Sequence, residues 1–313
     1  MIKQKFIYTF KYNHHYADLC KLETRQIFGK EEQNNLLFTD VEFDPTISPF
    51  IRERFEILSS SPDYSQLLHQ IEYNNIKLEG FKVEYLILEG DDTGYKERLN
   101  KLRDIGFRIE GIPNYKSPSR IYSICIYEDV WYFGIMKKHD IGWHKHKQKP
   151  HSFSYSIGMV TAKALASIAA KGDKSNILLD ACCGVGTIML EACFSGFKID
   201  GCDINWKAGR HTRENLKHFN YSADVFKSDI KNLDINYDAI IIDLPYNIYT
   251  TSNDTISQNI IDSASKLSNR IIIVSVSDIK QQIENSGLKV KDFCIVGKRG
   301  KSNFERKVWV CEK

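Results

Sequence analysis

The stretch LLDACCGVGTIMLEA, residues 178–192, indicates how the C-terminal half of this chain folds. A buried strand is expected to end at Asp180, and Gly184 and Gly186 indicate a turn. A helix is then expected to begin near Thr187, where its free N–H groups could bind a carboxylate or phosphate. Glycine-rich turns of this kind also occur for purely steric reasons, so the loop alone identifies no ligand.

The sequence on the C-terminal side of this stretch repeats the same alternation. From residue 177 onward, short apolar runs alternate with helical patterns, including helices expected over roughly 254–268 and near 279–286. Strands that alternate with helices predict a parallel sheet covered on both faces. The segments KDFCIVGK (291–298) and ERKVWVCEK (305–313) have no helix between them and predict an antiparallel hairpin at the end of the sheet. The pattern therefore predicts an α/β domain with seven strands.

The N-terminal half, residues 1–138, has a different, α+β pattern that is rich in aromatic residues. Its strand candidates are KFIYTFKY, FKVEYLIL, RIYSICIY and VWYFGIM, and its helix candidates are ADLCKLETRQIF and TGYKERLNKLRDIGF. Residues 137–152 contain five lysines and four histidines against one acid. We therefore predict an N-terminal region over 1–138, a basic linker over 139–152, and a second domain over 153–313. The linker is interpreted either as a contact for phosphates or as a solvated connector.

Composition narrows the class of protein. The 313 residues are 42% hydrophobic and 27% charged, which is ordinary for a soluble globular protein. No apolar run approaches the roughly 18 to 20 residues that span a bilayer, and no signal segment is expected at the N-terminus. The eight cysteines form no C-x-x-C pair, and no His/Cys cluster has zinc spacing, so no metal site is expected. A reducing cytoplasm is the simplest account of these cysteines.

Acidic residues follow the next two strands. Asp203 is placed to accept hydrogen bonds from ribose hydroxyls, and Asp229 is placed where an adenine amino group would lie. A single aspartate at a strand end is more often a helix cap. Because the carboxyl ends of parallel strands meet at one edge, features at successive junctions favour a nucleoside cofactor. NAD is a rival ligand, but the loop lacks the third glycine of its fingerprint. The candidate cofactor-binding residues are Asp180, Cys182, Gly184, Gly186, Thr187, Asp203, Ile204, Asp229 and Ile230.

The sequence DLPYN, residues 243–247, follows the fourth strand and suggests a reaction. The lone pair of a base amine is delocalised into the ring, so an enzyme that methylates it needs acceptors for the amine protons. Asp243 and the backbone carbonyl of Leu244 could supply two acceptors, Pro245 would fix the turn, and Tyr246 could stack on the base. A structural strand end is the alternative interpretation of this motif.

Residues 151–313 resemble the class I S-adenosylmethionine-dependent methyltransferases, and specifically the RNA guanosine-N2 methyltransferases that carry a THUMP domain. The motifs that carry the resemblance are DACCGVGTIMLEA, GCDIN, DLPY, KPHSFSYSIG and GKSNFERKVWV. It implies a Rossmann-like methyltransferase domain, S-adenosylmethionine as cofactor, and the N2 amine of a guanosine in tRNA, at position 10 or near the acceptor stem, as target. Asn247 stands where glycine is usual, and Cys182-Cys183 replaces the commoner pair.

The resemblance is looser in the N-terminal half, where YTFKYNHHYADLCKLETRQIFG and IYEDVWYFGI fit a ferredoxin-like and THUMP-like module that grips tRNA. A fragment that begins near Ser152 is therefore expected to bind cofactor but to methylate tRNA poorly. Methylation of DNA or rRNA is an alternative, because the same motif serves those substrates. A noncatalytic RNA-binding protein that keeps the cofactor as a structural ligand is another. The sequence does not show whether the chain has a protein partner.

Overall fold

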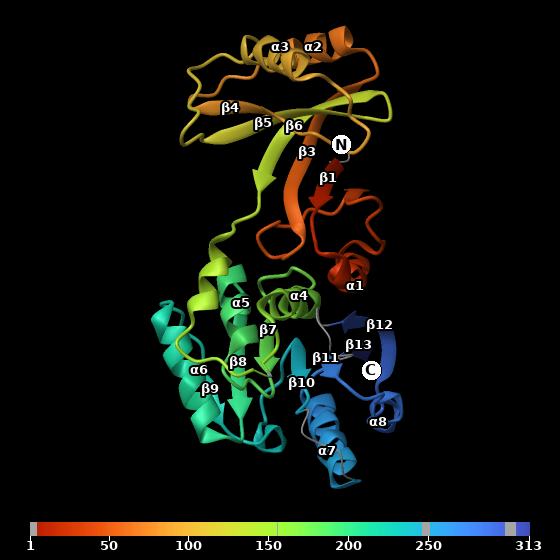
Figure 1. The fold of residues 1–313 in the computed structure, drawn as a ribbon, viewed down its shortest axis with the longest axis vertical. Helices are drawn as coiled ribbons and strands as arrows, with labels where there is room; N and C mark the ends of the chain where they lie inside the picture. Colours follow the sequence, from red (N-terminus) through yellow and green to blue (C-terminus); the bar gives the residue numbers. More distant parts are fainter. Residues whose placement is uncertain (1–4, 155, 246–250, 298–304) are drawn as a thin grey trace. The chain divides into compact units, whose positions relative to one another are not determined.

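The computed structural model describes residues 5–154, 156–245, 251–297 and 305–313 (Figure 1). The chain divides into two compact units. The first contains Met1–Lys11, Glu32–Pro45 and Ile51–His139, and the second contains Tyr12–Glu31, Thr46–Phe50 and Asp140–Lys313. Neither unit is one continuous segment, whereas the predicted ranges 1–138, 139–152 and 153–313 are consecutive. Two short N-terminal segments fold with the C-terminal half.

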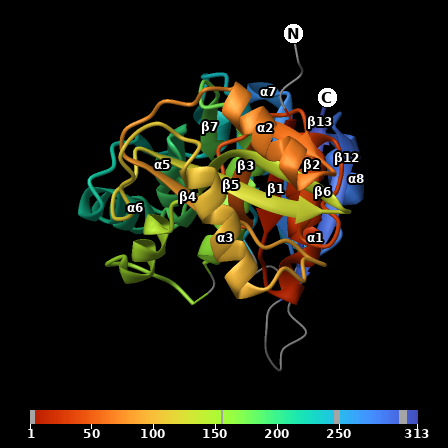
Figure 2. The same ribbon diagram turned by 90° about the horizontal axis from the view of Figure 1, so that it is seen from above.

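The first unit is built on a six-stranded sheet in the order β2-β1-β3-β6-β5-β4. Its strands are β1 Lys5–Phe10, β2 Leu36–Thr39, β3 Ile51–Ser61, β4 Phe81–Tyr85, β5 Arg120–Tyr127 and β6 Val130–Lys138, and its helices are α2 Tyr64–Tyr73 and α3 Tyr95–Gly106. Neighbouring strands are antiparallel except β4 and β5. Figure 2 shows α2 and α3 over this sheet. Leu67 of α2 and Ile105 of α3 are buried in one hydrophobic core with Phe133 of β6. The predicted α+β pattern is confirmed.

The sequence pattern missed β3, the strand between β1 and β6. Its first eight residues, IRERFEIL, include four charged residues, which obscure the alternation expected of a strand. Ile51 and Phe55 are nevertheless fully buried, and their even spacing places both side chains on the same face of the sheet. Charged residues between them are tolerated because their side chains find partners, as when Arg54 pairs with Glu42.

The second unit contains the predicted seven-stranded sheet, in the order β12-β13-β11-β10-β7-β8-β9. Its strands are β7 Ile177–Asp180, β8 Lys198–Asp203, β9 Val225–Lys227, β10 Ala239–Asp243, β11 Arg270–Ser275, β12 Lys289–Gly297 and β13 Glu305–Glu312. Its α-helices are α1 Ala17–Phe28, α4 Met159–Ala170, α5 Thr187–Ser195, α6 Trp206–His218, α7 Thr251–Leu267 and α8 Lys280–Asn285. The strands β11-β10-β7-β8-β9 are parallel, and β13 lies antiparallel between β11 and β12. Both the alternation and the terminal hairpin are confirmed.

The two faces of this sheet are covered by different helices. One hydrophobic core contains Ile240 and Ile242 of β10, Leu244 just beyond this strand, and Ile261 of α7. The alternate residues of these strands face α4. Arg270 on β11 is one of them, and its guanidinium donates to the carbonyl oxygens of Ile168 and Ala169 at the end of that helix. Asp243 shares a sheet face with Arg270, and its side chain therefore lies on the face that α4 covers.

Helix α1, near the N-terminus of the chain, packs against α4 and β12 of the second unit. The guanidinium of Arg25 makes two hydrogen bonds to the carboxylate of Asp292, at 3.0 and 2.7 Å. Glu23 is fully buried, accepts a hydrogen bond from Ser48 at 2.6 Å, and has its pKa raised to about 7 by burial. Helix α1 is therefore part of the core of this unit.

The basic segment predicted as a linker is folded. Residues Gly142–Gln148 form a 3-10 helix, and Trp143 and His146 within it are buried. The Nδ1 atom of His146 lies 2.8 Å from Glu191 Oε1, and its Nε2 atom lies 3.0 Å from the Tyr221 hydroxyl. These contacts fix the segment to the second unit. In the part of the chain that the structure describes, no helix is long and apolar enough to cross a membrane.

Candidate active site

The carboxyl ends of β7, β8, β9 and β10 surround a cavity of about 830 Å³. This volume is in the range of sites that hold a molecule the size of a nucleoside cofactor. Its lining includes the predicted residues Cys182, Asp203, Ile204, Asp229, Ile230, Asp243, Leu244 and Pro245. The fold thus brings together residues from four separate strand ends, as expected at the edge of a parallel sheet.

A second, smaller cavity of about 50 Å³ is lined by the remaining strand-end candidates Asp180, Gly184 and Thr187. Cys182 and Asp243 line both cavities. Gly186 lines neither cavity. Tyr246 lies outside the residues that the structure describes, so its predicted stacking role stays a prediction. The two cavities meet at the carboxylate proposed to bind the target amine.

The glycine loop adopts a backbone that favours glycine. Gly186 has φ +75° and precedes α5, which begins at Thr187 as predicted. A Cβ atom on Gly186 would lie 2.6 Å from Cγ2 of Thr212, so this glycine allows α6 to pack closely. Gly184 is held from both sides: its N–H donates to Asp203, and its carbonyl accepts from the Thr212 hydroxyl at 2.8 Å. The loop is therefore ordered by contacts within the protein.

Asp203 fixes the glycine loop as well as lining the larger cavity. Its Oδ2 accepts a hydrogen bond from Gly184 N at 2.9 Å, and its Oδ1 accepts one from Asn205 N at 2.8 Å. Each carboxylate oxygen has a further lone pair, so both can accept from a ligand hydroxyl. This pair of backbone contacts was not predicted from the sequence.

Asp229 combines the two roles that sequence analysis treated as alternatives. It is the N-cap of a short 3-10 helix, Ile230–Asn232, and accepts a hydrogen bond from Lys231 N at 3.1 Å. Its carboxylate also lies 3.3 Å from Lys231 Nζ. The same residue lines the larger cavity. The cap therefore holds the carboxylate in place at the cavity wall.

Two buried polar atoms at the smaller cavity have no hydrogen-bond partner among the described residues. They are Oδ1 of Asp180 and Oγ1 of Thr187. A buried polar atom without a partner costs about 1–3 kcal/mol. Burial raises the pKa of Asp180 well above its usual range, and the nearby carboxylates of Asp243 and Asp203 raise it further. A ligand that brings hydrogen-bond donors, and above all a positive charge, would relieve both costs.

Asp243 is the half-buried carboxylate at the end of β10. Burial raises its pKa to about 7, and the opposing effect of Arg306 lowers it. The carboxylate therefore changes its charge within the physiological range, with Asp180 as a nearby acidic neighbour. Such perturbed groups in a cavity are candidates for a functional role.

Arg306 of β13 was not predicted as a site residue. Across the sheet, Asp243 pairs with Val274, and Val274 pairs with Val308. Residues paired in this way share a face, and Arg306, two positions from Val308, shares it as well. Arg306 is half-buried, and its pKa is lowered by burial and raised by Asp243 and then by Tyr16. Only the pairing of β13 with β11 could have revealed this placement.

The cavity also has a wall from α7 that sequence analysis missed. Asn259, Asp262, Ser263 and Lys266 line it from this helix. The helix itself was predicted, but nothing in its local pattern distinguishes a polar face toward a ligand from one toward solvent.

Leu244 has a structural role that bears on its place in the motif. Its side chain is 4% exposed in the core that includes Ile242 and Ile261. Its N–H donates to the carbonyl of Val274 at 3.0 Å, which extends the parallel pairing of β10 with β11. Proline has no N–H to donate, so it could not replace leucine here without loss of this bond.

We therefore expect Leu244→Pro to destabilise the protein. The lost hydrogen bond leaves the buried Val274 carbonyl without this partner, at a cost of about 1–3 kcal/mol. Thermal denaturation should show a lower Tm than wild type, whereas Leu244→Met, which keeps both the N–H and the volume, should cost less than about 1.5 kcal/mol. Equal melting temperatures for the proline variant and wild type would show that this hydrogen bond is dispensable.

Residues 146–285 match the family model of the methyltransferase small domain. A tRNA (guanine(10)-N2)-dimethyltransferase of Methanothermobacter thermautotrophicus is 33% identical over 131 residues, covering 39% of this chain and 39% of that protein. A protein of the same name from Methanocaldococcus jannaschii is 27% identical over 219 residues, covering 62% of this chain and 61% of that protein. The chain thus spans 39% and 61% of the length of these two relatives.

The fold is similar to the crystal structure of TrmN from Thermus thermophilus. The TM-score is 0.50, with 14% sequence identity and coverage of 99% of both chains. At this identity the likeness concerns the fold alone. It agrees with the expectation of a Rossmann-like methyltransferase sheet accompanied by an N-terminal α+β region.

Proposed function

We propose that this chain, which carries a methyltransferase small domain over residues 146–285, transfers a methyl group from S-adenosylmethionine to the N2 amine of a guanosine in tRNA. The observation that carries this proposal is the position of Asp243, which lines both the nucleoside-sized cavity and the smaller one. The names of the two relatives support the choice of guanine N2 and of tRNA.

The residues at the two cavities fit S-adenosylmethionine. Asp203 would accept hydrogen bonds from the ribose hydroxyls, and Asp229 and Ile230 would lie along the adenine in the larger cavity. Asp180 and Thr187 at the smaller cavity would bind the charged amino-acid end, which would satisfy their partnerless atoms. When bound, S-adenosylmethionine supplies an electrophilic methyl group on a sulfonium.

The protein's contribution to the reaction would lie mainly in holding the target amine. An ionised Asp243 would accept a hydrogen bond from one amine proton, and the Leu244 carbonyl would accept from the other. Two acceptors draw the amine lone pair out of conjugation with the ring and direct it at the methyl group. Because the pKa of Asp243 is about 7, this arrangement should weaken as the pH falls below neutrality.

The remaining parts of the assignment rest on the same proposal. The N-terminal unit would be a THUMP-like module that binds tRNA, the target would be the guanosine at position 10, and the enzyme would be cytoplasmic. A noncatalytic protein that retains the cofactor is disfavoured by the retention of Asp243 and Pro245 at the cavity. Methylation of DNA or rRNA remains as the alternative substrate class.

The proposal is tested by incubating the purified chain with S-adenosylmethionine that carries an isotopically labelled methyl group and an unmodified tRNA transcript. Nucleoside mass spectrometry of the digested tRNA should show labelled N2-methylguanosine or N2,N2-dimethylguanosine. A matched transcript in which adenosine replaces the guanosine at position 10 should remain unlabelled. Label on adenosine, on cytidine, or on DNA offered in the same assay would contradict the proposed substrate.

We expect Arg306→Gln to shift the pH dependence of methyl transfer. Arg306 lowers the pKa of Asp243, so its removal should raise that pKa and move the acidic limb of kcat/KM upward by about one unit. Arg306→Lys keeps the positive charge, so its pH profile should stay close to that of wild type. Lys307→Gln, one residue along β13 and on the opposite face, is the matched control and should leave the profile unchanged. An identical profile for Arg306→Gln and wild type would exclude this role.

A further inference from the structure

The folded basic segment lies against helix α6. The backbone N–H of His151 donates to Oδ1 of Asn215 at 2.9 Å, and Nδ2 of Asn215 donates back to the carbonyl of His151 at 2.9 Å. The rings of His151 and His211 stack with centroids 4.0 Å apart and planes 3° apart. Farther back along the chain, His146 bonds to Tyr221 just beyond α6. Residues 146–153 therefore pack against the middle and C-terminal part of α6 and the residues just beyond it, and we call the solvent-facing side of residues 142–153 and α6 the connector–α6 surface.

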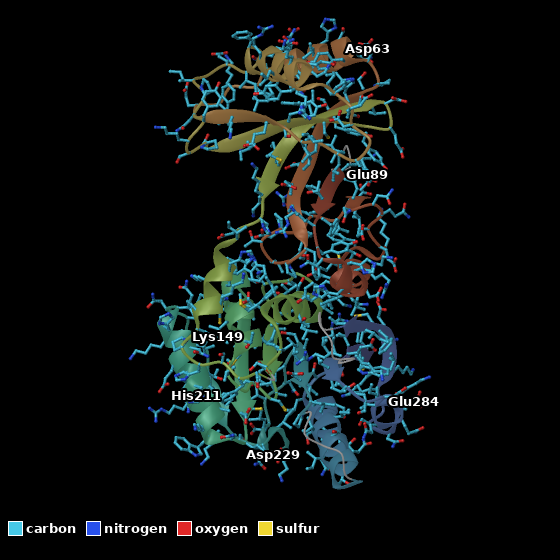
Figure 3. The ribbon with its side chains drawn as sticks, viewed as in Figure 1. Asp63, Glu89, Lys149, His211, Asp229 and Glu284 are labelled. Carbon is cyan, nitrogen blue, oxygen red and sulfur yellow. The ribbon has the colours of Figure 1, made fainter. Side chains whose placement is uncertain are left out.

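The connector–α6 surface is strongly positive. The exposed cations on it are Lys145, Lys147, Lys207, Arg210, Arg213 and Lys217. The acid within these two segments is Glu214, and it lies 2.5 Å from His151 Nε2 and 2.8 Å from Arg210 Nε. Lys149 is half-buried, and burial lowers its pKa. Figure 3 labels Lys149 on the connector and His211 on α6. An ordered set of cations, unlike a loose basic linker, presents its charges at fixed positions.

Exposed aromatic side chains accompany these cations. Phe153 is 49% exposed and contacts the ring of His211, and Trp206 at the start of α6 is 56% exposed. Side chains of this kind next to cations can stack on bases while the cations bind phosphates. A membrane surface would instead require a continuous apolar face, which the alternating cations of α6 do not offer.

The surface begins at the wall of the larger cavity. Ile204 lines that cavity and is 74% exposed, and the side chain of Asn205 accepts from Lys207 N at 3.0 Å to cap α6. Helix α6 therefore leads away from the same strand end that provides Asp203. A polyanion bound along it would have one end beside the cavity.

We propose that the connector–α6 surface binds the phosphate backbone of RNA and guides it to the cavity. This inference rests on the proposed function for the identity of the polymer. It assigns RNA contact to the catalytic unit itself, in addition to any contact made by the N-terminal unit. Each cation in contact with a phosphate releases a counterion, so the contribution of the surface should depend on salt.

The test compares tRNA binding by the full chain with that of the variant Lys145→Gln/Lys147→Gln/Lys207→Gln/Lys217→Gln. At about 0.1 M NaCl the affinity for an unmodified tRNA transcript should fall at least about tenfold. The plot of log affinity against log salt should become shallower by about 2 to 4, because about one unit is lost for each phosphate contact. The control is Lys289→Gln/Lys291→Gln on β12, which removes two positive charges at the opposite edge of the same sheet and should keep the affinity within about twofold of wild type.

Two further measurements make the outcome decisive. An unchanged Tm and an unchanged affinity for S-adenosylmethionine show that the variant with four Lys→Gln substitutions is folded. If this folded variant binds tRNA with the affinity and the salt dependence of wild type, the inference is overturned. Loss of binding to anionic phospholipid vesicles without any loss of tRNA affinity would also overturn it. If wild type binds tRNA through this surface but methylates no guanosine, the surface stands and the proposed substrate fails.

Discussion

Asp243→Asn should reduce single-turnover methyl transfer to tRNA by about 10³-fold or more. The substitution keeps the size of the side chain but replaces an anionic acceptor with a neutral amide at the place where both cavities meet. The carboxylate is needed chiefly in the transition state, when the amine lone pair turns toward the methyl group. The loss should therefore appear in kcat, whereas the affinities for cofactor and tRNA should be nearly unchanged.

The control for this experiment is Asp262→Asn, in the α7 wall of the same cavity. It removes one negative charge from the lining without touching the strand end, and it should retain activity within about tenfold. Single-turnover rates near pH 8, where Asp243 is ionised, would decide the matter. An Asp243→Asn enzyme with nearly wild-type rates would show that the amine is held by other groups.

A fragment that contains residues 152–313 should fail to fold cooperatively. Sequence alone predicts that such a fragment binds cofactor, but it lacks α1 and the connector, which belong to the second compact unit. Loss of α1 removes the buried side chains of Leu19, Leu22 and Phe28 from that unit. Each such loss costs about 2–5 kcal/mol, and the total stability of a domain is only about 5–15 kcal/mol.

Circular dichroism melting and calorimetry with S-adenosylmethionine would test this expectation. The fragment should show no cooperative transition and no measurable binding. The control is Arg25→Gln in the full chain, which breaks the pair with Asp292 and keeps the apolar surface of α1. It should melt only several degrees below wild type, because this partly buried ion pair, whose side chains are 31% and 15% exposed, contributes about 1–3 kcal/mol. A fragment that melts and binds like the full chain would show that the catalytic unit is self-sufficient.

The sequence by itself determined the alternating strands and helices of the C-terminal half and the strand-end part of the cavity lining. Runs such as Ile240–Ile242 and the glycines before α5 act locally, through hydrophobic periodicity and backbone preference, so they can be read without knowledge of distant residues. Strand-end aspartates such as Asp203 and Asp243 could be grouped because parallel strands place their carboxyl ends at one edge.

Only the tertiary structure decided which distant segments join that edge. Arg306 reaches the face of Asp243 because β13 inserts antiparallel between β11 and β12, and α1 enters the core because its apolar side chains pack on α4 and β12. The hydrogen bond from Leu244 to Val274 likewise follows from strand register. Register and packing depend on the fit of complete surfaces between segments far apart in the chain, and no local pattern encodes that fit.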